Sequence, residues 1–365
     1  MMSESSVQGG AGDVFEVRYQ HVIVEGTPYE AGKLQAEFLK STGRPLISYD
    51  PPEPEKTARE MRRLYDQYCP GLNDELQGVA DGLGLPFEKV LFCAYIGLAA
   101  HHCSHVVALP TITADHHVHV GRVYDLSLEG ADLRLCTTRI KGKAQHLGFS
   151  EMLSGRNDGI NSHGLCVTFS SSWDQVPGGV EEGKGLYYAM AVRALLEHCQ
   201  TVGEALEFLQ RTPILGGVNL MVADRAGNAA LVETGGGRRA IKTVNRDSVE
   251  QYLLSTNHYT LLGVSEHNPN STARYEALRS WLTANAGRIN REGLKEFFAR
   301  EGPEGVCGYS RELRIGSLWS MAFDLSEGTV EVRFGPPPHN GWHVFTLDGP
   351  VGVNEYQAVF PGKRT

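Results

Sequence analysis

Cys103 occupies a position from which a thiol could act as a nucleophile. It lies where a helical pattern changes to short runs of strand-forming residues, and Ser104 follows it. About twenty residues further on, Gly121-Arg-Val-Tyr-Asp125 brings an arginine and an aspartate to the end of the next expected strand. If the peptide bond after His102 were cut, the freed α-amino group of Cys103, with an ordinary pKa of about 7.7–8.0, could take the proton of its own thiol. Such an amine can act as the general base for the thiol without any histidine, although the residues alone are more typical of a buried structural cysteine.

Histidines gather around this cysteine and suggest a second kind of chemistry. On a strand, His117 and His119 share a face, as do Cys103 and His105. Two ligands from each of two paired strands would suit zinc, so a histidine-rich metal-binding protein stays open as an alternative. The spacing matches no common zinc motif, and we therefore expect no metal, with the histidines on exposed strand faces and in a loop. Six of the 14 histidines are in this group: His101, His102, His105, His116, His117 and His119.

Composition and charge exclude several classes of protein. The 365 residues carry a formal net charge of −9, with 41% hydrophobic and 21% charged residues, which is typical of a globular protein. An acidic chain without a run of lysine and arginine is a poor match for nucleic acid or an anionic membrane. No apolar stretch approaches the ~18 residues of a membrane-spanning helix, and the polar N-terminus lacks a secretory signal. We expect a cytoplasmic protein without a nucleic-acid or membrane partner.

The seven cysteines give no sign of a disulfide framework. Their number is odd, they are spread along the chain, and no Cys-x-x-Cys occurs. This usage is typical of a reducing compartment, and we expect most of these side chains to be small buried apolar groups.

Helical and strand-like patterns follow each other in blocks. Asp224–Gly227 and Asp324–Gly328 indicate hairpin turns between strands. Because parallel βαβ alternation is weak, the blocks predict an α+β fold with sheets packed together and helices outside. The expected helices are 29–39, 55–68, 72–83, 86–100, 186–199, 202–211, 270–286 and 291–300. The expected strands are 103–109, 117–124, 133–140, 164–171, 218–224, 229–234, 239–244, 250–255, 317–324, 328–334 and 342–347.

Six short motifs, in order over about residues 20–362, resemble those of acyl-coenzyme A:isopenicillin N (6-aminopenicillanic acid) acyltransferase and its relatives. These relatives are autoproteolytic cysteine N-terminal-nucleophile (Ntn) hydrolases. The resemblance implies a four-layer αββα sandwich with two stacked, mainly antiparallel sheets. The motifs are Glu25-Gly-Thr-Pro-Tyr-Glu-Ala-Gly32, Cys103-Ser104, Gly121-Arg-Val-Tyr-Asp125, Gly159-Ile-Asn-Ser-His-Gly164, Ser255-Thr-Asn-His258, and Leu313-Arg-Ile-Gly-Ser-Leu-Trp319 with Asp324 and Gly335-Pro336.

The resemblance also implies roles for individual residues. Cys103 would be the nucleophile, with its own amino group as the base once the His102–Cys103 bond is cleaved. Asn257 matches the asparagine that donates to the oxyanion of the tetrahedral intermediate. Asp125 matches an aspartate that orients the new ammonium group or assists self-cleavage. Arg314 matches an arginine beside the site, where it could pair with Asp125 or with a substrate carboxylate.

Three further residues are candidates for contact with substrate, and three positions depart from the family pattern. Tyr124, His258 and Trp319 lie inside the matching motifs and are our substrate-binding candidates, although aromatic residues such as Tyr124 and Trp319 more often pack in a core. His102 stands where the family has glycine before the nucleophile. Val123 replaces an asparagine and Leu313 replaces a serine.

Together these features predict an amide hydrolase or acyltransferase that forms a thioester on Cys103. We expect a tail over 1–19, a helical segment over 20–102 and a catalytic segment over 103–365, with 20–365 forming one structural domain. The partner would be a small-molecule amide or acyl-thioester; no cofactor is expected, and a homo-oligomer stays open. The alternatives are an unprocessed protein of the same fold, repurposed for small-molecule binding or another reaction, and the metal-binding protein above.

Overall fold

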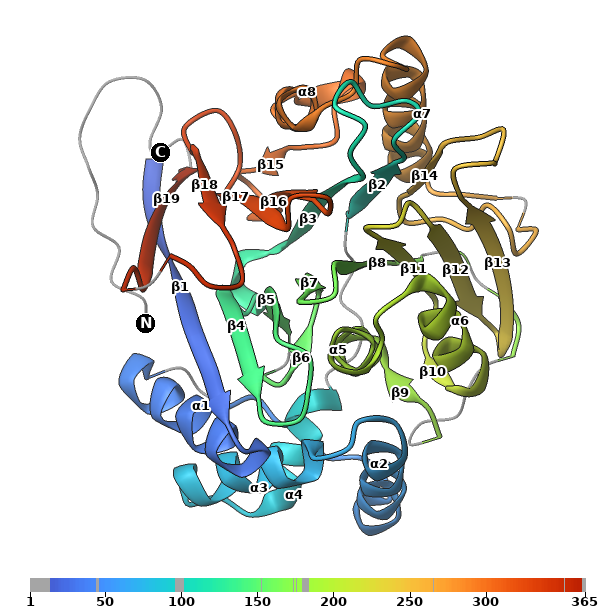
Figure 1. Cartoon of the computed structure of the whole chain (residues 1–365). Coiled ribbons are helices and arrows are strands. Elements are labelled where there is room, and N and C mark those ends of the chain that lie inside the picture. The colour runs from blue at the N-terminus through green and yellow to red at the C-terminus, as the bar shows by residue number, and fades with distance from the viewer. Residues whose placement is uncertain are drawn as a thin grey trace.

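Two stacked sheets form the centre of the molecule, and helices cover their outer faces (Figure 1). This arrangement confirms the α+β class and the four-layer αββα sandwich expected from the sequence. The computed structural model describes residues 14–43, 46–95, 102–151, 153–172, 174, 176–178, 184–264, 266–350 and 352–362.

The larger sheet has ten strands and runs from the β13 edge to the β19 edge. Its neighbouring strands are antiparallel except β1 and β4, which are parallel. In order, the strands are β13 (Arg238–Val244), β12 (Ala229–Gly235), β11 (Val218–Asp224), β8 (Leu165–Ser171), β7 (Asp158–Asn161), β5 (His146–Glu151), β4 (Arg134–Ile140), β1 (Val14–Gly26) and β19 (Glu355–Pro361), with β6 (Gly155–Arg156) beside β5.

The smaller sheet has seven strands, all paired antiparallel. In order they are β14 (Tyr252–Ser255), β2 (Ser104–Ala108), β3 (His119–Ser127), β16 (Ile315–Asp324), β17 (Thr329–Phe334) and β18 (Trp342–Phe345), with β15 (Tyr309–Ser310) beside β16. A separate parallel pair joins β9 (Leu186–Tyr187) to β10 (Ile214–Leu215).

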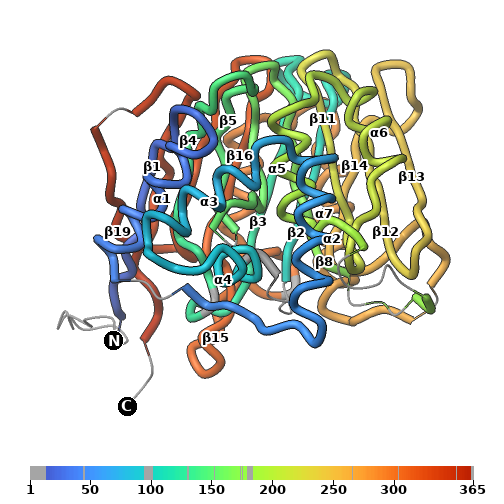
Figure 2. Tube along the Cα trace, turned by 90° about the horizontal axis from the view of Figure 1, so that it is seen from below, coloured from blue at the N-terminus to red at the C-terminus, as the bar shows by residue number. Residues whose placement is uncertain are grey.

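The helices divide between the two outer faces. On the ten-stranded sheet lie α1 (Pro28–Thr42), α2 (Pro54–Tyr68), α3 (Leu72–Leu83), α4 (Phe87–Leu91), α5 (Tyr188–His198) and α6 (Val202–Arg211), and Figure 2 shows most of them side by side across that face. The seven-stranded sheet is covered by α7 (Pro269–Ala284) and α8 (Arg291–Phe297). Three short 3₁₀ turns complete the described elements: Phe92–Tyr95, Leu128–Gly130 and Gly302–Glu304.

Aromatic side chains fill the space between the sheets. Trp319 of β16 is stacked on Tyr124 of β3 at 3.9 Å and on Phe149 of β5 at 4.0 Å between ring centroids. All three side chains are fully buried. Burial of residues this large is a main source of the free energy that holds two sheets together.

The first family-like motif has a structural purpose in this fold. Thr27 caps α1 by accepting a hydrogen bond from the backbone of Glu30, whose side chain accepts one from the backbone of Thr27. Helices α1 and α3 then touch closely, because a Cβ on Gly32 would lie 1.9 Å from the carbonyl oxygen of Glu75. The motif therefore starts and packs α1, and it lies in the helical layer rather than among the catalytic candidates.

The N-terminal boundary differs from the expectation. Residues 14–19, which we expected to belong to a tail over 1–19, form the first part of β1 and pair with β19. Their alternation of apolar and polar residues is a strand pattern, and the structure buries Val17 and Tyr19. Residues 1–13 lie outside the described part of the chain.

All seven cysteines lie in the described part of the chain, where each is a buried free thiol; we expected burial for most of them. Within that same part of the chain, no helix has the length and apolar character that a membrane span needs.

Candidate active site

Three strand ends converge on Cys103. This residue directly precedes β2, which lies between β14 and β3 in the seven-stranded sheet. Ser104 pairs with Val123, so the end of β3 brings Tyr124 and Asp125 alongside, and the backbone N–H of His102 donates to the carbonyl of Asp125 at 3.2 Å. On the other side, Ser255 of β14 pairs with His105. The residues that follow β14, beginning with Thr256 and Asn257, therefore also reach Cys103.

The thiol of Cys103 is fully buried between charged groups. Burial raises its pKa, while hydrogen bonding and the positive charge of Arg122 oppose that rise, and the charge of Asp125 adds to it. Arg122 is itself fully buried, and its Nε lies 3.5 Å from a carboxylate oxygen of Asp158.

Arg274, on α7, joins Cys103 to Asn257. Its Nη1 donates to the carbonyl oxygen of Cys103 at 2.6 Å and to Oγ of Ser104 at 2.8 Å, and its Nη2 donates to Oδ1 of Asn257 at 2.8 Å. Its Nε donates to Oδ1 of Asn270, one helical turn earlier, at 2.9 Å. One guanidinium thus fixes the backbone of the candidate nucleophile and the side chain of the candidate oxyanion donor.

The amide of Asn257 is oriented by contacts on both sides. Its Nδ2 donates to the carbonyl oxygen of Ser171 at 2.8 Å, and Arg274 occupies Oδ1. A carboxamide nitrogen carries two N–H donors, so one donor is not used by Ser171. The backbone N–H of Asn257 donates to Oγ of Ser271 at 2.7 Å, which holds the loop against α7.

His258 packs under the same loop. Its Nδ1 lies 2.8 Å from Oγ of Ser271 and 3.1 Å from Oγ1 of Thr256. Burial lowers the pKa of His258 to about 4, so the ring is neutral at physiological pH. Its ring contacts, with His267 and Tyr275, are those of a packed side chain. A substrate contact of His258 stays a prediction.

Asp125 is almost completely buried on the face of the sheet that α7 covers. Burial raises its pKa to about 7, although Arg274, Ser317, Arg122 and Arg333 each act in the opposite direction. The structure therefore brings Cys103, Asp125 and Asn257 together. The structure also places two arginines, Arg122 and Arg274, near these residues. Neither of them was assigned a role from the sequence.

Tyr124 and Trp319 lie in the inter-sheet core described above. The hydroxyl of Tyr124 donates to Glu151 at 3.3 Å, and Nε1 of Trp319 donates to Asp158 at 3.0 Å. Both side chains are fully buried. Tyr124 and Trp319 thus pack in the core, as aromatic residues more often do. A substrate contact of either residue stays a prediction.

A role of Arg314 in the site stays a prediction. This residue precedes β16, has a left-handed φ of 53°, and its guanidinium carbon lies 5.2 Å from the centroid of the Phe15 ring. Its Nε lies 4.0 Å from a carboxylate oxygen of Glu129. These contacts in the described part of the chain direct Arg314 toward β1, and Arg274 is the guanidinium that reaches the Cys103 backbone.

The histidine-rich segment divides between the two ends of β2 and β3. His105 pairs with Arg122, whereas His119 pairs with Ala108 at the far end of the two strands. Cys103 and His105 thus cannot share a metal ion with His117 and His119. His105 and His119 are fully buried, contrary to the exposed strand faces that we expected. His101 lies outside the described residues.

A cleft of about 820 Å³ has Ser172 and Tyr259 in its lining. Ser172 follows Ser171, which accepts a hydrogen bond from the amide of Asn257, and Tyr259 comes two residues after Asn257. Among the described residues of that lining, none is Cys103, Asp125, Asn257 or Arg274. The hydroxyl of Tyr259 closes over Gly217 and Gly235, where an added Cβ would lie 2.5 and 2.4 Å from that oxygen. Three arginines also line the cleft: Arg211, Arg238 and Arg239.

The comparisons with known proteins place the chain in a family. Residues 113–339 match the sequence model of the family described as acyl-coenzyme A:6-aminopenicillanic acid acyl-transferase. The match covers more than half of the chain, and the chain belongs to this family, as its sequence motifs indicated. The matched range begins after Cys103 and contains Asp125, Asn257 and Arg314. A search of curated proteins found no significant match.

Several solved structures are similar to this one at low sequence identity. Penicillin V acylase from Agrobacterium tumefaciens is 17% identical, with 66% of this chain and 85% of that chain covered and a TM-score of 0.41. A mutant of conjugated bile acid hydrolase from Clostridium perfringens is 16% identical, with 72% and 97% covered and a TM-score of 0.45. The Caenorhabditis elegans orthologue of N-acylethanolamine-hydrolyzing acid amidase is 14% identical, with 61% and 93% covered and a TM-score of 0.43.

Proposed function

We propose that this protein is a cysteine Ntn-type enzyme that cleaves small amides, by hydrolysis or acyl transfer, through a thioester on Cys103. The observation that carries the proposal is the single guanidinium of Arg274, which binds both the backbone of Cys103 and the amide of Asn257. A buried arginine with these two partners would hold the backbone of the nucleophile and the oxyanion donor in a fixed relation. Family membership supports acyl transfer as the class of reaction.

Maturation would begin with the thiol of Cys103 attacking the carbonyl carbon of His102. The Sγ–C bond forms, the C–N bond of the peptide breaks, and the nitrogen of Cys103 takes the thiol proton to become an amine. Water then hydrolyses the resulting thioester, leaving a carboxylate on His102 and a free thiol on Cys103. The imidazole of His102 belongs to the residue before the scissile bond and could assist proton transfer there, although burial lowers its pKa and so weakens it as a base.

Turnover would repeat the same chemistry on a substrate amide. The freed α-amine of Cys103 takes the thiol proton, the thiolate attacks the substrate carbonyl, and the amine product leaves with a proton. The remaining N–H of Asn257 would donate to the oxyanion, a contribution worth about 3 kcal/mol when such a donor is fixed in advance. Water completes hydrolysis, and a second amine would complete transfer. Arg122, close to the thiol, would stabilise the thiolate.

The arginine-lined cleft favours a substrate with an acidic group. Arg238 and Arg239 each donate one hydrogen bond to a backbone carbonyl, and a guanidinium has five N–H donors, so both retain capacity for a carboxylate. Asp174, the acid in the lining, already accepts from Tyr259 and lies 2.9 Å from Nδ1 of His267. We therefore assign N-acyl amino acids, or related acidic amides, to this cleft.

Burial of the thiol favours one second candidate. Because Cys103 is fully buried and its pKa is raised, an uncut protein would present no nucleophile to a substrate. Such a protein would be a binding protein that uses the same cleft. Cleavage of the chain distinguishes it from the enzyme.

Turnover of a panel of N-acyl amino acids tests the proposal. Purified wild type, Cys103→Ala and Cys136→Ala are incubated with each acid and with its neutral carboxamide, and released amine is measured. Cys136 is a matched control, since it is a buried thiol on β4. We expect wild type and Cys136→Ala to turn over the substrates and to prefer the acids. Cys103→Ala should show no turnover. Equal turnover by Cys103→Ala would contradict the nucleophile assignment, and a preference for the carboxamides would contradict the acidic-substrate assignment.

A further inference from the structure

Two histidines and two aspartates meet at the end of β3 that is remote from Cys103. Asp115 lies in the loop before β3, His117 precedes that strand, and His119 begins it, paired across the sheet with Asp324 at the end of β16. One ligand atom from each of the four side chains lies within 4.8 Å of all the others. We call these four residues the Asp–His cluster. The fold assembles it from positions more than 200 residues apart.

The backbone explains why both imidazoles point the same way. His117 and His119 are two residues apart in extended chain, so they share one face, while Val118 between them is buried in the core on the other. Their ring centroids are 6.1 Å apart. Each imidazole faces a carboxylate: Nδ1 of His117 lies 2.9 Å from Asp324, and Nε2 of His119 lies 3.0 and 2.9 Å from the two oxygens of Asp115.

The site combines burial, access and negative charge. The side chain of His119 is fully buried, and its Nδ1 has no hydrogen-bond partner among the described residues. A pocket of about 390 Å³ opens onto Asp115, His117 and Asp324, and Glu327 and Glu292 also line it. Among the described residues of that lining, the one arginine or lysine is Arg291, which lies 2.7 Å from Glu331. Carboxylates thus outnumber cations around the two histidines.

We propose that the Asp–His cluster binds a divalent transition-metal ion, for which zinc is the best match. Imidazole nitrogen and carboxylate oxygen are ligands that zinc accepts in tetrahedral sites, at about 2.0–2.2 Å from the ion. Ligand atoms of such a tetrahedron are about 3.4 Å apart, so the present group needs only small rotations to close around an ion. The ion would replace the two histidine–carboxylate hydrogen bonds and join the loop before β3 to the end of β16.

This ion would have a structural role and no part in the proposed amide chemistry. β2 has five residues, so the cluster and Cys103 are about 17 Å apart along the strands. The proposal stands on different residues from the proposed function, and either can fail without the other.

Titration of metal-free protein with Zn²⁺ and Co²⁺ tests this site. The proteins are wild type, His117→Ala, Asp115→Asn and, as a matched control, His339→Ala, which removes an exposed histidine outside the cluster. Isothermal titration measures stoichiometry and affinity, and thermal unfolding measures whether Zn²⁺ raises Tm. Visible spectra of the Co²⁺ protein report the ligands, because a thiolate ligand adds an intense charge-transfer band and nitrogen and oxygen ligands do not.

We expect wild type and His339→Ala to bind one Zn²⁺, with a raised Tm and a tetrahedral Co²⁺ spectrum that lacks the thiolate band. His117→Ala and Asp115→Asn should bind at least 10-fold more weakly. His117 is the primary test because its side chain is 28% exposed and its removal leaves the core intact. The proposal is overturned if wild type binds no Zn²⁺, if both variants bind as tightly as wild type, or if the Co²⁺ protein shows thiolate ligation.

Discussion

Asp125 is a candidate site residue whose ionisation the fold alters. Its carboxyl group is buried beside Cys103, and its pKa is raised to about 7 by that burial. In an unfolded chain the pKa is about 3.9. Folding therefore favours the protonated form, and the folded protein loses stability as the pH rises from about 4 through about 7. Below about pH 4 Asp125 is protonated in both the folded and the unfolded protein. Above about pH 7 it is ionised in both, and the loss of stability no longer changes with pH.

Replacing Asp125 by asparagine should separate stability from activity. Asp125→Asn removes a buried charge, so we expect its free energy of unfolding at pH 8 to exceed that of wild type, by about 1–4 kcal/mol for a shift of this size. Self-cleavage and turnover should nevertheless be lost. Urea unfolding at pH 4, 6 and 8, together with mass analysis of the purified chains, measures both effects.

Glu151 supplies the matched control for this variant. It is also buried with its pKa raised to about 7, and its side chain accepts hydrogen bonds from Tyr124 and Asn157. Glu151→Gln should share the gain in stability at pH 8 and still be processed. An Asp125→Asn protein that is cleaved and active like Glu151→Gln would remove Asp125 from the mechanism.

Among individual residues, the sequence predicted the candidate nucleophile and two of its neighbours, but it did not predict the two arginines around them. Cys103, Asp125 and Asn257 were found from motifs, and the structure brings these three together. Arg122 stood inside a quoted motif and could have been included. Arg274 has no such signal, since it is 171 positions from Cys103 and its role depends on how α7 packs on the sheet. Only three-dimensional packing could identify it.

Helix α7 acts as the element that aligns the site. Asn268 caps it, and Ser271 and Arg274, spaced on its inner face, bind the loop of Asn257 and the start of β2. The helix is thus a rigid support for two strand ends that carry the chemistry. A residue that acts in this way positions the reacting groups without touching the substrate.

We predict that Arg274→Gln slows self-cleavage and turnover by about 10- to 100-fold, the loss expected when a hydrogen-bonding cation worth about 1.5–3 kcal/mol is removed. Arg279→Gln, on the exposed side of the same helix and paired with Glu276, is the control and should match wild type. If Arg274 positions the reacting groups, Arg274→Gln should lower kcat more than it raises KM, and Arg274→Lys should restore part of the rate. Unchanged kcat in a folded Arg274→Gln protein would argue against that role.

At the element scale, strands were missed where local pattern was weak or was attributed to a tail. β5 and β7 are short, and each contains a glycine in a tight contact: an added Cβ on Gly148 would lie 1.9 Å from the carbonyl of Asp158. β1 and β19 lie at the two ends of the chain and pair only with distant strands. Hairpins with local turns, such as β11–β12 and β16–β17, were predicted correctly because their pairing is encoded within a few residues.

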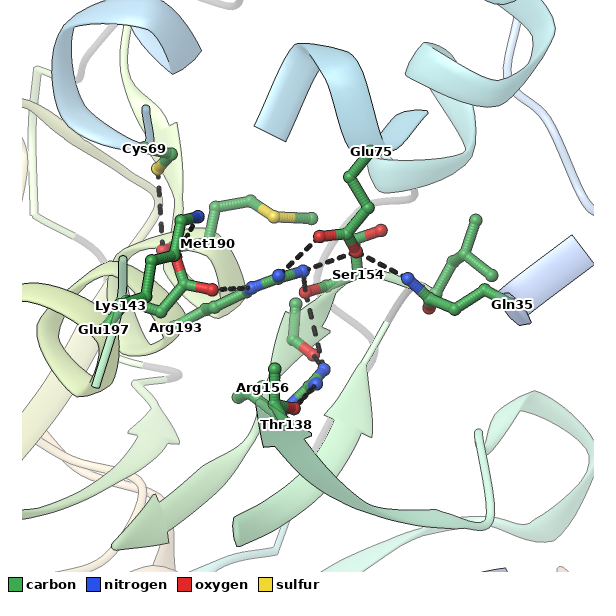
Figure 3. A network of polar contacts seen from close by, with 12 residues as sticks. Gln35, Cys69, Glu75, Thr138, Lys143, Ser154, Arg156, Met190, Arg193 and Glu197 are labelled. Atoms are coloured by element: carbon green, nitrogen blue, oxygen red, sulfur yellow. Dashed lines mark hydrogen bonds and ion pairs between the residues drawn. The ribbon is translucent and has the colours of Figure 1, made fainter. Parts of the chain in front are cut away.

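At the scale of the whole molecule, the segments before and after Cys103 are interlocked. β1 lies between β4 and β19, so the N-terminal segment supplies an inner strand of the ten-stranded sheet. A buried network of polar contacts adds to this link (Figure 3). Arg193 of α5 binds both carboxylate oxygens of Glu75 of α3, at 2.8 and 2.5 Å, and its Nε lies 2.8 Å from Glu197. Gln35 of α1 donates to Glu75 at 2.5 Å.

This interlocking determines what self-cleavage would do to the molecule. Breaking one peptide bond removes none of the strand pairs or buried ion pairs, whereas separating the two products would break the β1 pairings and the Arg193–Glu75 ion pair. The two products should therefore stay together as one folded particle. The fold also explains how a cut chain could keep Asp125, Asn257 and Arg274 in place around the new N-terminus.

Self-cleavage before Cys103 can be measured by intact-mass spectrometry of the purified protein, taken from a single peak of native size-exclusion chromatography. We predict two polypeptides in the wild-type peak, residues 1–102 and 103–365, whose masses sum to that of the full chain plus one water. Cys103→Ala should give only the full chain, and Cys136→Ala should give both products. A wild-type protein that remains one uncut chain, or a Cys103→Ala protein that is cleaved at the same bond, would contradict it.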